Sequence, residues 1–289
     1  MDKSITTRFG SYVLRFICED QGVLDLLELH FHDYISDARP DVSIIITVVT
    51  PEKISTVKNV SASRYAFLDK ETVNFGPNLI EGRWDFCNKR FNLLISKSLM
   101  VQEELWLFDR FLCSLYYTLV MNDTNRNHCP FIVHSSGVIR DGRGYVFFGP
   151  PESGKSTLAS LSRKFTVIHD DMNIVTLDGK SVMIEGVPFN PKLINRTNER
   201  APLSMICSLH KSDTIKLERR AADEFTQKVL AEIFLPMPLF SNDRKSAFQY
   251  LLTCVRELSQ KVPYYRLYFK KDESFWDIIE KEEGKNGKY

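Results

Sequence analysis

The sequence lacks the long apolar runs and the charge surplus that mark several classes of protein. No apolar stretch approaches the roughly 20 residues that cross a bilayer, and the N-terminal segment Met1–Ile5 lacks the apolar core of a signal peptide. The formal net charge is only +1 at pH 7, so the charge balance points neither to nucleic acid nor to an anionic membrane as a partner. These absences predict a cytoplasmic protein that binds neither nucleic acid nor membrane.

The chain also lacks paired cysteines, internal repeats and low-complexity tracts. None of its six cysteines stands in a CxxC pair, and most lie in apolar runs such as Phe111-Leu112-Cys113. This distribution predicts small buried hydrophobic residues in a reducing compartment. With 43% hydrophobic and 26% charged residues over 289 positions, the chain can form the core of one large domain or of two smaller ones.

The first 127 residues have the pattern of an α/β domain. Runs of β-branched and aromatic residues predict strands, at positions 12–18, 43–50, 65–68, 72–75 and 91–95. A short helix is predicted at 23–34, and apolar residues at three- and four-residue spacing predict a long helix at 101–121, with core packing favoured over a partner surface. We expect an antiparallel sheet, and the polar run 122–127 is the expected joint with a second domain.

Beyond the joint, short strands alternate with turns. The predicted strands lie at 131–133, 137–140, 145–148 and 166–169. Asp141-Gly142 separates the second from the third and is typical of a hairpin turn. The sequence therefore predicts a second domain over residues 128–289.

The most informative run is Gly149-Pro150-Pro151-Glu152-Ser153-Gly154-Lys155-Ser156-Thr157, which has the pattern of a phosphate-binding P-loop. It follows an apolar run that reads as a strand and leads into a helical run. In that order, the loop amides and the helix N-terminus converge on one point and favour a polyphosphate. The Lys155 ammonium would contact the terminal phosphates, and the Ser156 hydroxyl would ligate Mg²⁺. The predicted nucleotide-binding residues are Gly149, Ser153, Gly154, Lys155, Ser156 and Thr157.

Two features of this loop depart from an ideal phosphate cradle. Pro150 and Pro151 have no N–H, although the amides that hold phosphate usually come from the later half of the loop. Glu152 brings a carboxylate that would repel a polyphosphate unless it points to solvent. A strand-to-helix turn that binds nothing is the structural alternative.

Two adjacent carboxylates, Asp170 and Asp171, follow the predicted strand 166–169, one helix after the loop. A nucleotide enzyme needs carboxylates at such a strand end, one to hold magnesium and another to accept a proton from an attacking hydroxyl. An acidic turn that only closes the strand is the alternative.

Four motifs occur in a fixed order along the second half, namely His134-Ser135-Ser136-Gly137-Val138, the hairpin Arg140–Gly144, the P-loop and Ile168-His169-Asp170-Asp171. This series resembles the HPr kinase/phosphorylase family, in particular its HPr-kinase-like serine kinases. The resemblance covers about 128–193, where Gly186–Phe189 and Lys192-Leu193 fit the following segment, and it is weaker over 202–276. It implies an α/β protein whose C-terminal P-loop domain has a mixed sheet of the phosphoenolpyruvate-carboxykinase type, preceded by a smaller α/β domain.

The resemblance also implies roles for individual residues. Lys155 and Ser156 become the phosphate and magnesium contacts, Asp170 the base on the acceptor hydroxyl and Asp171 the metal partner. The two aspartate roles can be exchanged, because adjacent carboxylates near one metal couple their titrations. His134 matches a histidine near the phosphates, with a core histidine at a strand end as the alternative. The implied catalytic residues are Asp170, Asp171, His134 and Lys155, and the implied metal ligands are Ser156 and Asp171.

One family segment is missing. The Glu-x-Arg-Gly-Leu-Gly pattern has its nearest remnant in Glu199–Leu203, which lacks both glycines, so the resemblance does not extend to HPr as the acceptor. The sequence looks more like divergent kinases that phosphorylate peptides or small molecules in biosynthetic clusters.

The expected activity is Mg²⁺-dependent transfer of the γ-phosphoryl group of ATP to a hydroxyl, foremost of serine, in a protein, peptide or small molecule. A non-catalytic nucleotide-binding regulatory protein and an NTPase coupled to assembly are the alternatives. Because the family includes multimers, a homo-oligomer stays open.

Overall fold

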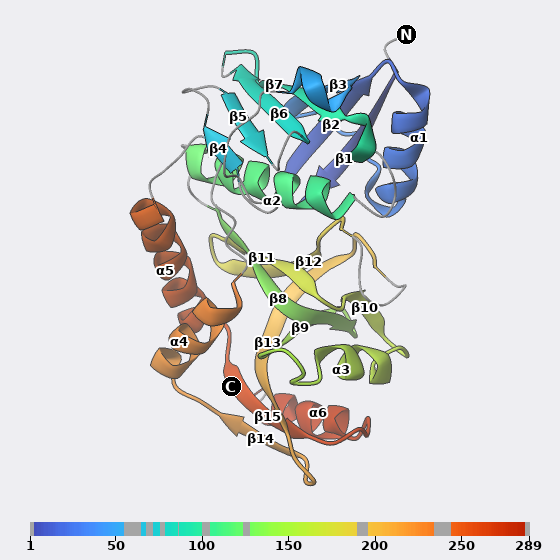
Figure 1. The fold of residues 1–289 in the computed structure, drawn as a ribbon. Coiled ribbons are helices and arrows are strands. Elements are labelled where there is room, and N and C mark those ends of the chain that lie inside the picture. Colours follow the sequence, from blue (N-terminus) through green and yellow to red (C-terminus); the bar gives the residue numbers. More distant parts are fainter. Residues whose placement is uncertain are drawn as a thin grey trace. The chain divides into compact units, whose positions relative to one another are not determined.

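The fold is that of a computed structural model, which describes residues 3–54, 65–67, 72–75, 79–85, 87–99, 105–123, 128–189, 196–233 and 244–286 (Figure 1). The chain forms two compact units. The first comprises Met1–Thr124, Pro188–Asn190 and Pro236–Arg244, and the second comprises Asn125–Val187, Pro191–Leu235 and Lys245–Tyr289. Each unit contains a sheet with both parallel and antiparallel pairs, so the protein is of the mixed α/β class. Most of the predicted joint 122–127, and Lys192-Leu193, lie outside the described residues.

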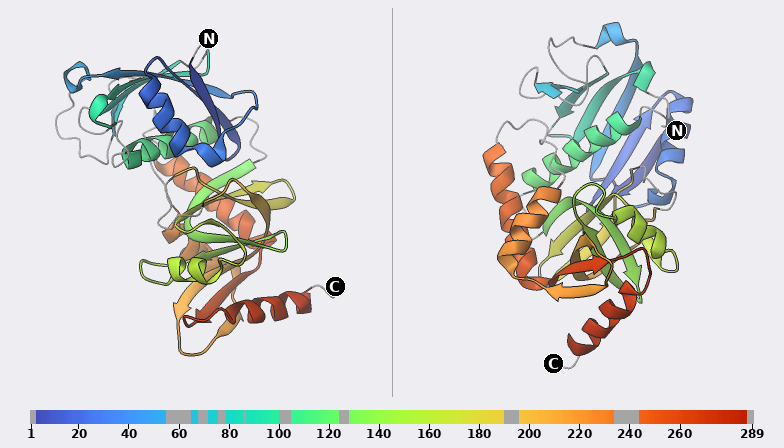
Figure 2. Two further views of the ribbon diagram at one scale, coloured as in Figure 1. Left: turned by 90° about the vertical axis from the view of Figure 1, so that its right-hand side faces the viewer. Right: turned by 60° about the horizontal axis from the view of Figure 1, so that its bottom comes forward.

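The first unit contains a seven-stranded sheet in the order β1-β2-β3-β7-β6-β5-β4. The strands are β1 Ser4–Phe9, β2 Tyr12–Cys18, β3 Val42–Val49, β4 Tyr65–Phe67, β5 Thr72–Phe75, β6 Ile80–Asp85 and β7 Arg90–Ser96. The pairs β2–β3 and β3–β7 are parallel, so the expected antiparallel sheet is wrong at its centre. The reason is helix α1, Gln21–His30, which packs beside β1 and β2 and carries the chain back across the sheet before β3 begins (Figure 2).

Helix α2, Leu105–Asn122, supplies much of the core of the first unit. The ring of Phe108 lies 6.0 Å from that of Phe16 on β2, and the ring of Phe111 lies 5.4 Å from that of Phe91 on β7. The predicted apolar face is therefore buried against the sheet. The predicted first turn, 101–104, lies outside the described residues. In the described part of the chain, no helix is both long and apolar enough to span a membrane.

The second unit contains an eight-stranded sheet. The strands are β8 His128–Arg140, β9 Arg143–Phe148, β10 Thr166–His169, β11 Met172–Asp178, β12 Ser181–Gly186, β13 Arg200–Lys211, β14 Lys216–Arg219 and β15 Tyr264–Phe269. The predicted strands 131–133 and 137–140 are one strand, β8. The polar pair Ser135-Ser136 does not interrupt it, because both serines are fully buried and the Ser135 hydroxyl donates to the Val133 carbonyl over 3.1 Å.

Strands β8 and β9 form the predicted hairpin. Its central residues Asp141 and Gly142 have φ values of +51° and +71°, and Arg140 pairs with Arg143 across the turn. Positive φ at both central positions is the turn geometry that Asp-Gly sequences favour, since it matches the twist of the flanking strands. The hairpin delivers the chain into β9, whose end leads into the P-loop sequence.

Strand β13 lies between β9 and β15 and is parallel to both. Ser208 on β13 pairs with Phe148 on β9, and Lys211 at the end of β13 pairs with Phe269 at the end of β15. The carboxyl ends of three adjacent strands therefore lie at one edge of the sheet, where open α/β folds bind their ligands. The helices of this unit are α3 Lys155–Leu161, α4 Ala222–Glu232, α5 Arg244–Lys261 and α6 Phe275–Asn286.

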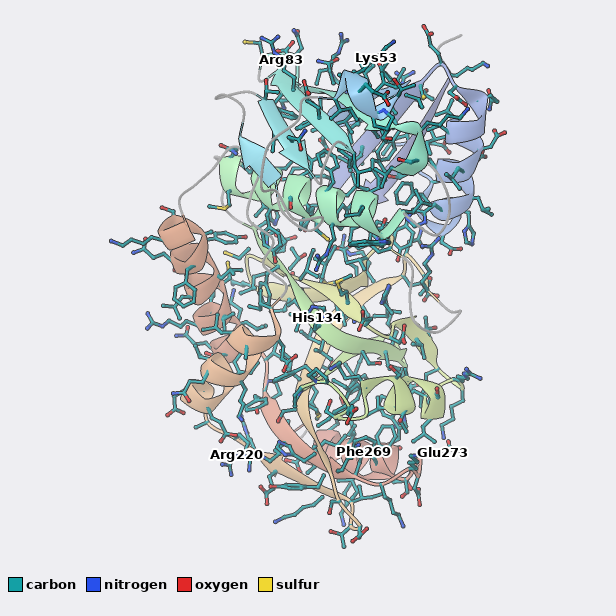
Figure 3. All side chains as sticks on the ribbon, viewed as in Figure 1. Lys53, Arg83, His134, Arg220, Phe269 and Glu273 are labelled. Atoms are coloured by element: carbon teal, nitrogen blue, oxygen red, sulfur yellow. The ribbon has the colours of Figure 1, made fainter. Side chains whose placement is uncertain are left out.

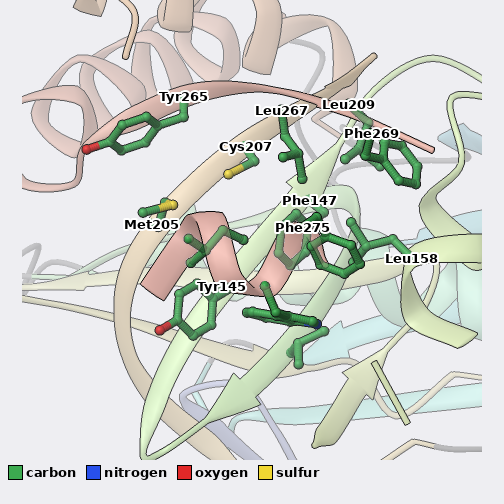
Figure 4. Packing of buried hydrophobic residues seen from close by; sticks show 13 residues of the cluster. Tyr145, Phe147, Leu158, Met205, Cys207, Leu209, Tyr265, Leu267, Phe269 and Phe275 are labelled. Atoms are coloured by element: carbon green, nitrogen blue, oxygen red, sulfur yellow. The ribbon is translucent and has the colours of Figure 1, made fainter. Parts of the chain in front are cut away.

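A core of aromatic and aliphatic side chains joins these three strands to α6 (Figure 4). The ring of Trp276 on α6 lies 5.1 Å from that of Tyr145 and 5.7 Å from that of Phe147, nearly perpendicular to both. Its indole N–H donates to the Ser162 hydroxyl over 3.1 Å. Truncating such a buried ring to alanine costs about 3–5 kcal/mol. One continuous core therefore supports the strand ends that carry the candidate site.

Candidate nucleotide-binding site

The P-loop sequence occupies the connection between β9 and α3, in the predicted order of strand, loop and helix. Gly154 immediately precedes the helix and has a φ of +108°, which side-chain-bearing residues rarely adopt. A Cβ atom at Gly154 would lie 2.6 Å from Cζ of Phe269, the last residue of β15 (labelled in Figure 3). Only glycine satisfies both the backbone angle and this close approach.

Within the loop, Lys155 and Ser153 have contrasting surroundings. The Lys155 ammonium donates to the carbonyl of Gly149 and, over 3.3 Å, to that of Pro150, so it lies against the loop backbone. The Ser153 hydroxyl is buried and has no hydrogen-bond partner among the described residues. A buried hydroxyl stabilises the fold poorly unless it is paired. A loop that holds an ammonium and a hydroxyl in this way suits an anion with several acceptor oxygens.

A pocket of about 350 Å³ lies at the loop. Four of the predicted nucleotide-binding residues line it, together with Glu152 and two lysines that the sequence did not point to, the full lining being Glu152, Gly154, Lys155, Ser156, Thr157, Lys211 and Lys271. Lys211 is the last residue of β13, and Lys271 follows β15 by two residues. Both come to the loop because β9, β13 and β15 are parallel and end at the same edge.

The neighbouring histidine adds no positive charge to this edge at neutral pH. His210, one residue before Lys211, is partly buried and its ring lies 5.4 Å from that of Tyr268. Burial lowers the pKa of His210, and the positive charge of Arg266 lowers it further. The cationic character of the pocket therefore comes from its lysines.

The paired carboxylates lie one strand beyond β9. Strand β10 matches the predicted strand 166–169, and Asp170-Asp171 falls between β10 and β11, both of which pair with β8. The N–H of Ser135 on β8 donates to the Asp171 carbonyl over 3.0 Å, and Ser135 also pairs with Phe148, next to the loop. The backbone of Asp171 is thus two strand spacings, roughly 10 Å, from the end of β9. The fold therefore brings the two predicted clusters to opposite sides of the same strand, β8.

Two buried residues fix the turn that carries these carboxylates, and sequence reasoning assigned neither a role. His169 is fully buried, and its Nδ1 accepts the N–H groups of Asp171 and Met172, each over 3.1 Å. Nδ1 is therefore unprotonated and the imidazole carries its proton on Nε2. The Asn173 amide donates to the Ser135 carbonyl, the Ser135 hydroxyl and the His169 carbonyl, at 2.8, 3.1 and 3.3 Å.

The predicted catalytic residues differ in burial. Asp170 is fully buried, whereas Asp171 is partly exposed. His134 lies on β8 opposite Met172 and is also partly exposed, so it is not a fully enclosed core histidine (Figure 3). The pocket at the loop is lined by Lys155 but by none of these three residues.

The side chains predicted to hold magnesium have the oxygen donors that this ion prefers. Mg²⁺ prefers oxygen ligands and is usually bound through one or two carboxylates, with phosphate oxygens and water completing the octahedron. The Ser156 hydroxyl and the carboxylates of Asp170 and Asp171 are donors of this kind. Among the described residues no group of three or more His, Cys, Asp or Glu side chains converges on one point, so the nucleotide would have to supply part of the coordination.

Comparison with known proteins finds no match in sequence and a distant likeness in structure. No family model matches the chain, and no curated protein matches it in sequence. Among solved structures, the chain is similar to the Hpr(Ser) kinase/phosphatase from Coxiella burnetii, at 14% identity and a TM-score of 0.23, over 45% of this chain and 92% of that one. At this level of similarity, function has to be argued from the residues of the chain itself.

Proposed function

We propose that this protein is an ATP-dependent kinase that transfers the γ-phosphoryl group to a hydroxyl of a protein, peptide or small molecule, with serine as the foremost acceptor. The observation that carries the proposal is the position of the P-loop sequence. It lies at the shared carboxyl edge of three parallel strands, beside a pocket lined by lysines, and two carboxylates follow β10, which β8 separates from β9.

In the proposed reaction the acceptor oxygen attacks the γ-phosphorus, the bond to the β–γ bridging oxygen breaks, and ADP leaves. Lys155 and the loop amides stabilise negative charge on the transferring group. A bound Mg²⁺, held by Ser156 and one aspartate, would neutralise phosphate charge. The other aspartate accepts the hydroxyl proton.

The burial of the two aspartates favours exchanging the roles that the resemblance implies for them, in which Asp170 is the base and Asp171 the metal partner. The base must reach the acceptor hydroxyl to within hydrogen-bond distance. Asp171 is partly exposed, whereas Asp170 is fully buried. We therefore propose Asp171 as the base and Asp170 as the residue that orients the turn or reaches the metal.

Calorimetric titration with MgATP and a phosphoryl-transfer assay test this proposal. Lys155→Ala should weaken MgATP binding by about a hundredfold, because a charge-assisted phosphate contact is lost. The matched control is Lys164→Ala, since Lys164 pairs with Glu273 and lies outside the pocket, and it should bind as the wild type does. An equal affinity in both variants would refute the nucleotide site.

Transfer is measured with γ-labelled ATP and a panel of serine-containing peptides and small alcohols. Asp171→Asn should retain MgATP affinity and lose about 10²–10⁴-fold in transfer rate, the usual contribution of a general base. Asp170→Asn reports on the alternative assignment. Tight MgATP binding with no transfer by the wild type to any member of the panel would instead favour the non-catalytic regulatory protein.

A further inference from the structure

Two lysines outside the P-loop sequence share its pocket. Lys211 and Lys271 come from β13 and from the segment after β15, and both line the same pocket as Lys155. The parallel register explains this placement. Because Ser208 pairs with Phe148, Lys211 lies three residues, about 10 Å, beyond the level at which β9 ends and the loop begins.

The end of β15 is held against the loop as well. Phe269 approaches Gly154 so closely that a methyl group there would overlap the ring, at 2.6 Å. Phe269 also belongs to the buried core around Trp276. Phe269 therefore fixes the main chain beside the loop, and Lys271 follows only two residues later.

The charges of the pocket are unbalanced. Three lysines and Glu152 line it, and the formal charges of these four residues add up to +2. Nearby lysines are paired, since Lys164 contacts Glu273 at 2.6 Å and Lys270 contacts Asp272 at 3.5 Å. Within the described part of the chain, neither Lys211 nor Lys271 forms an ion pair. Like charges gathered in one pocket repel each other unless an anion binds between them.

The lining also restricts what that anion can be. The residues that line it are glycine, serine, threonine, glutamate and lysine, with no aromatic or branched aliphatic residue among them. A volume of about 350 Å³ is at the small end of the range for ligand pockets, roughly 300–1,000 Å³. Such a pocket has groups that recognise phosphates and none that recognises a base.

We infer that Lys211 and Lys271 are further phosphate-binding residues, which with Lys155 form a three-lysine clamp that favours a nucleoside triphosphate over a diphosphate. The excess of two positive charges matches the two negative charges of MgATP, and MgADP carries one fewer. The inference rests on the proposed function, because it assigns residues to the same nucleotide site. It adds a physical basis for release of the product nucleotide after transfer.

The test compares Mg²⁺ complexes of ATP and ADP by calorimetry with four variants. Lys211→Met and Lys271→Met should each weaken MgATP binding by about tenfold, and MgADP binding by about twofold to threefold, since one charge contact is lost. The double variant should therefore lose most of the preference for ATP. Lys270→Met is the matched control, because Lys270 is adjacent, exposed and paired with Asp272, and it should leave both affinities unchanged.

The outcomes separate this inference from the function on which it rests. If Lys155→Ala weakens MgATP binding while both new variants bind like Lys270→Met, the clamp is refuted and the nucleotide site stands. If the wild type binds no MgATP, both are refuted. A uniform loss for ATP and ADP in the double variant would refute the discrimination between them. Thermal unfolding should show equal midpoints for the Lys211, Lys270 and Lys271 variants, since these exposed lysines contribute little to stability.

Discussion

Glu152 is the residue of the loop that opposes its neighbours in two ways. Its backbone has a φ of +65°, in the left-handed region, and its carboxylate lines a pocket that otherwise carries three lysines. Glu152→Gly should therefore raise both the stability of the protein and its affinity for MgATP. Glu152→Gln provides the matched control, because it removes the charge and leaves the backbone strain.

The two effects have different magnitudes. A left-handed backbone costs a side-chain-bearing residue about 1–2 kcal/mol, and glycine returns about 0.4–1 kcal/mol of this through the greater freedom of the unfolded chain. The net gain is about 0.5–1 kcal/mol, or roughly 1–4 °C in the unfolding midpoint. A pocket of this volume is about 9 Å across. At about 8 Å in a solvent-like dielectric, a carboxylate repels a dianion by about 1 kcal/mol, which is about fivefold in affinity.

Scanning calorimetry and titration with MgATP separate the two effects. Glu152→Gly should show the higher midpoint and the higher affinity, and Glu152→Gln only the higher affinity. Raising the ionic strength should shrink the affinity gain, because screening weakens the repulsion. The strain argument fails if glycine does not raise the midpoint above that of glutamine. The charge argument fails if both variants bind MgATP no better than the wild type.

Three further predictions concern the scaffold of the second unit. Gly154→Ala should lower the free energy of unfolding by about 2 kcal/mol in a urea titration, through backbone strain and overlap with Phe269. Asn173→Ala leaves buried acceptors unpaired and should lower the same quantity by about 1–3 kcal/mol, and an unchanged value would contradict the proposed bracing. The pKa of Cys129 is lowered by a hydrogen bond from Cys254, whereas that contact and burial raise the pKa of Cys254. Iodoacetamide at pH 8 should therefore modify Cys129 much faster than Cys254. Peptide mass spectrometry measures both rates, and equal rates would contradict the prediction.

The parts of the site that could be predicted from the sequence are those with local causes. Each of these features depends on residues that are close together in the sequence, namely the glycines and lysine of the loop, the apolar run before it and the Asp141-Gly142 turn. The structure has the strand, loop, helix and hairpin in the predicted order. Strand β10 likewise begins and ends where its apolar residues predict.

The parts that could not be predicted depend on pairing between distant segments. Lys211 and Lys271 line one pocket because β13 is parallel to both β9 and β15. The periodicity of apolar residues does not indicate whether paired strands are parallel, so this pocket could not be predicted. Ser135 illustrates the converse. A polar residue in an apolar run suggests a break, yet its groups are satisfied by Val133, Asp171 and Asn173 from neighbouring segments, so β8 continues through it.

The separation of charge across β8 bears on the proposed chemistry. The lysines of the pocket lie on the side of β9, β13 and β15, and the carboxylates lie between β10 and β11, where the backbone of Asp171 is about 10 Å from the end of β9. In-line transfer needs a base about 2.7 Å from the acceptor oxygen and that oxygen about 3–3.5 Å from phosphorus. A further 4 Å or so joins phosphorus to a lysine that holds its oxygens. These lengths add up to about 10 Å, which is the distance that the proposed reaction requires between the base oxygen and the lysine nitrogen. His169 and Asn173 brace the turn that carries these carboxylates, because His169 accepts the N–H of Asp171 and the Asn173 amide donates to the Ser135 carbonyl.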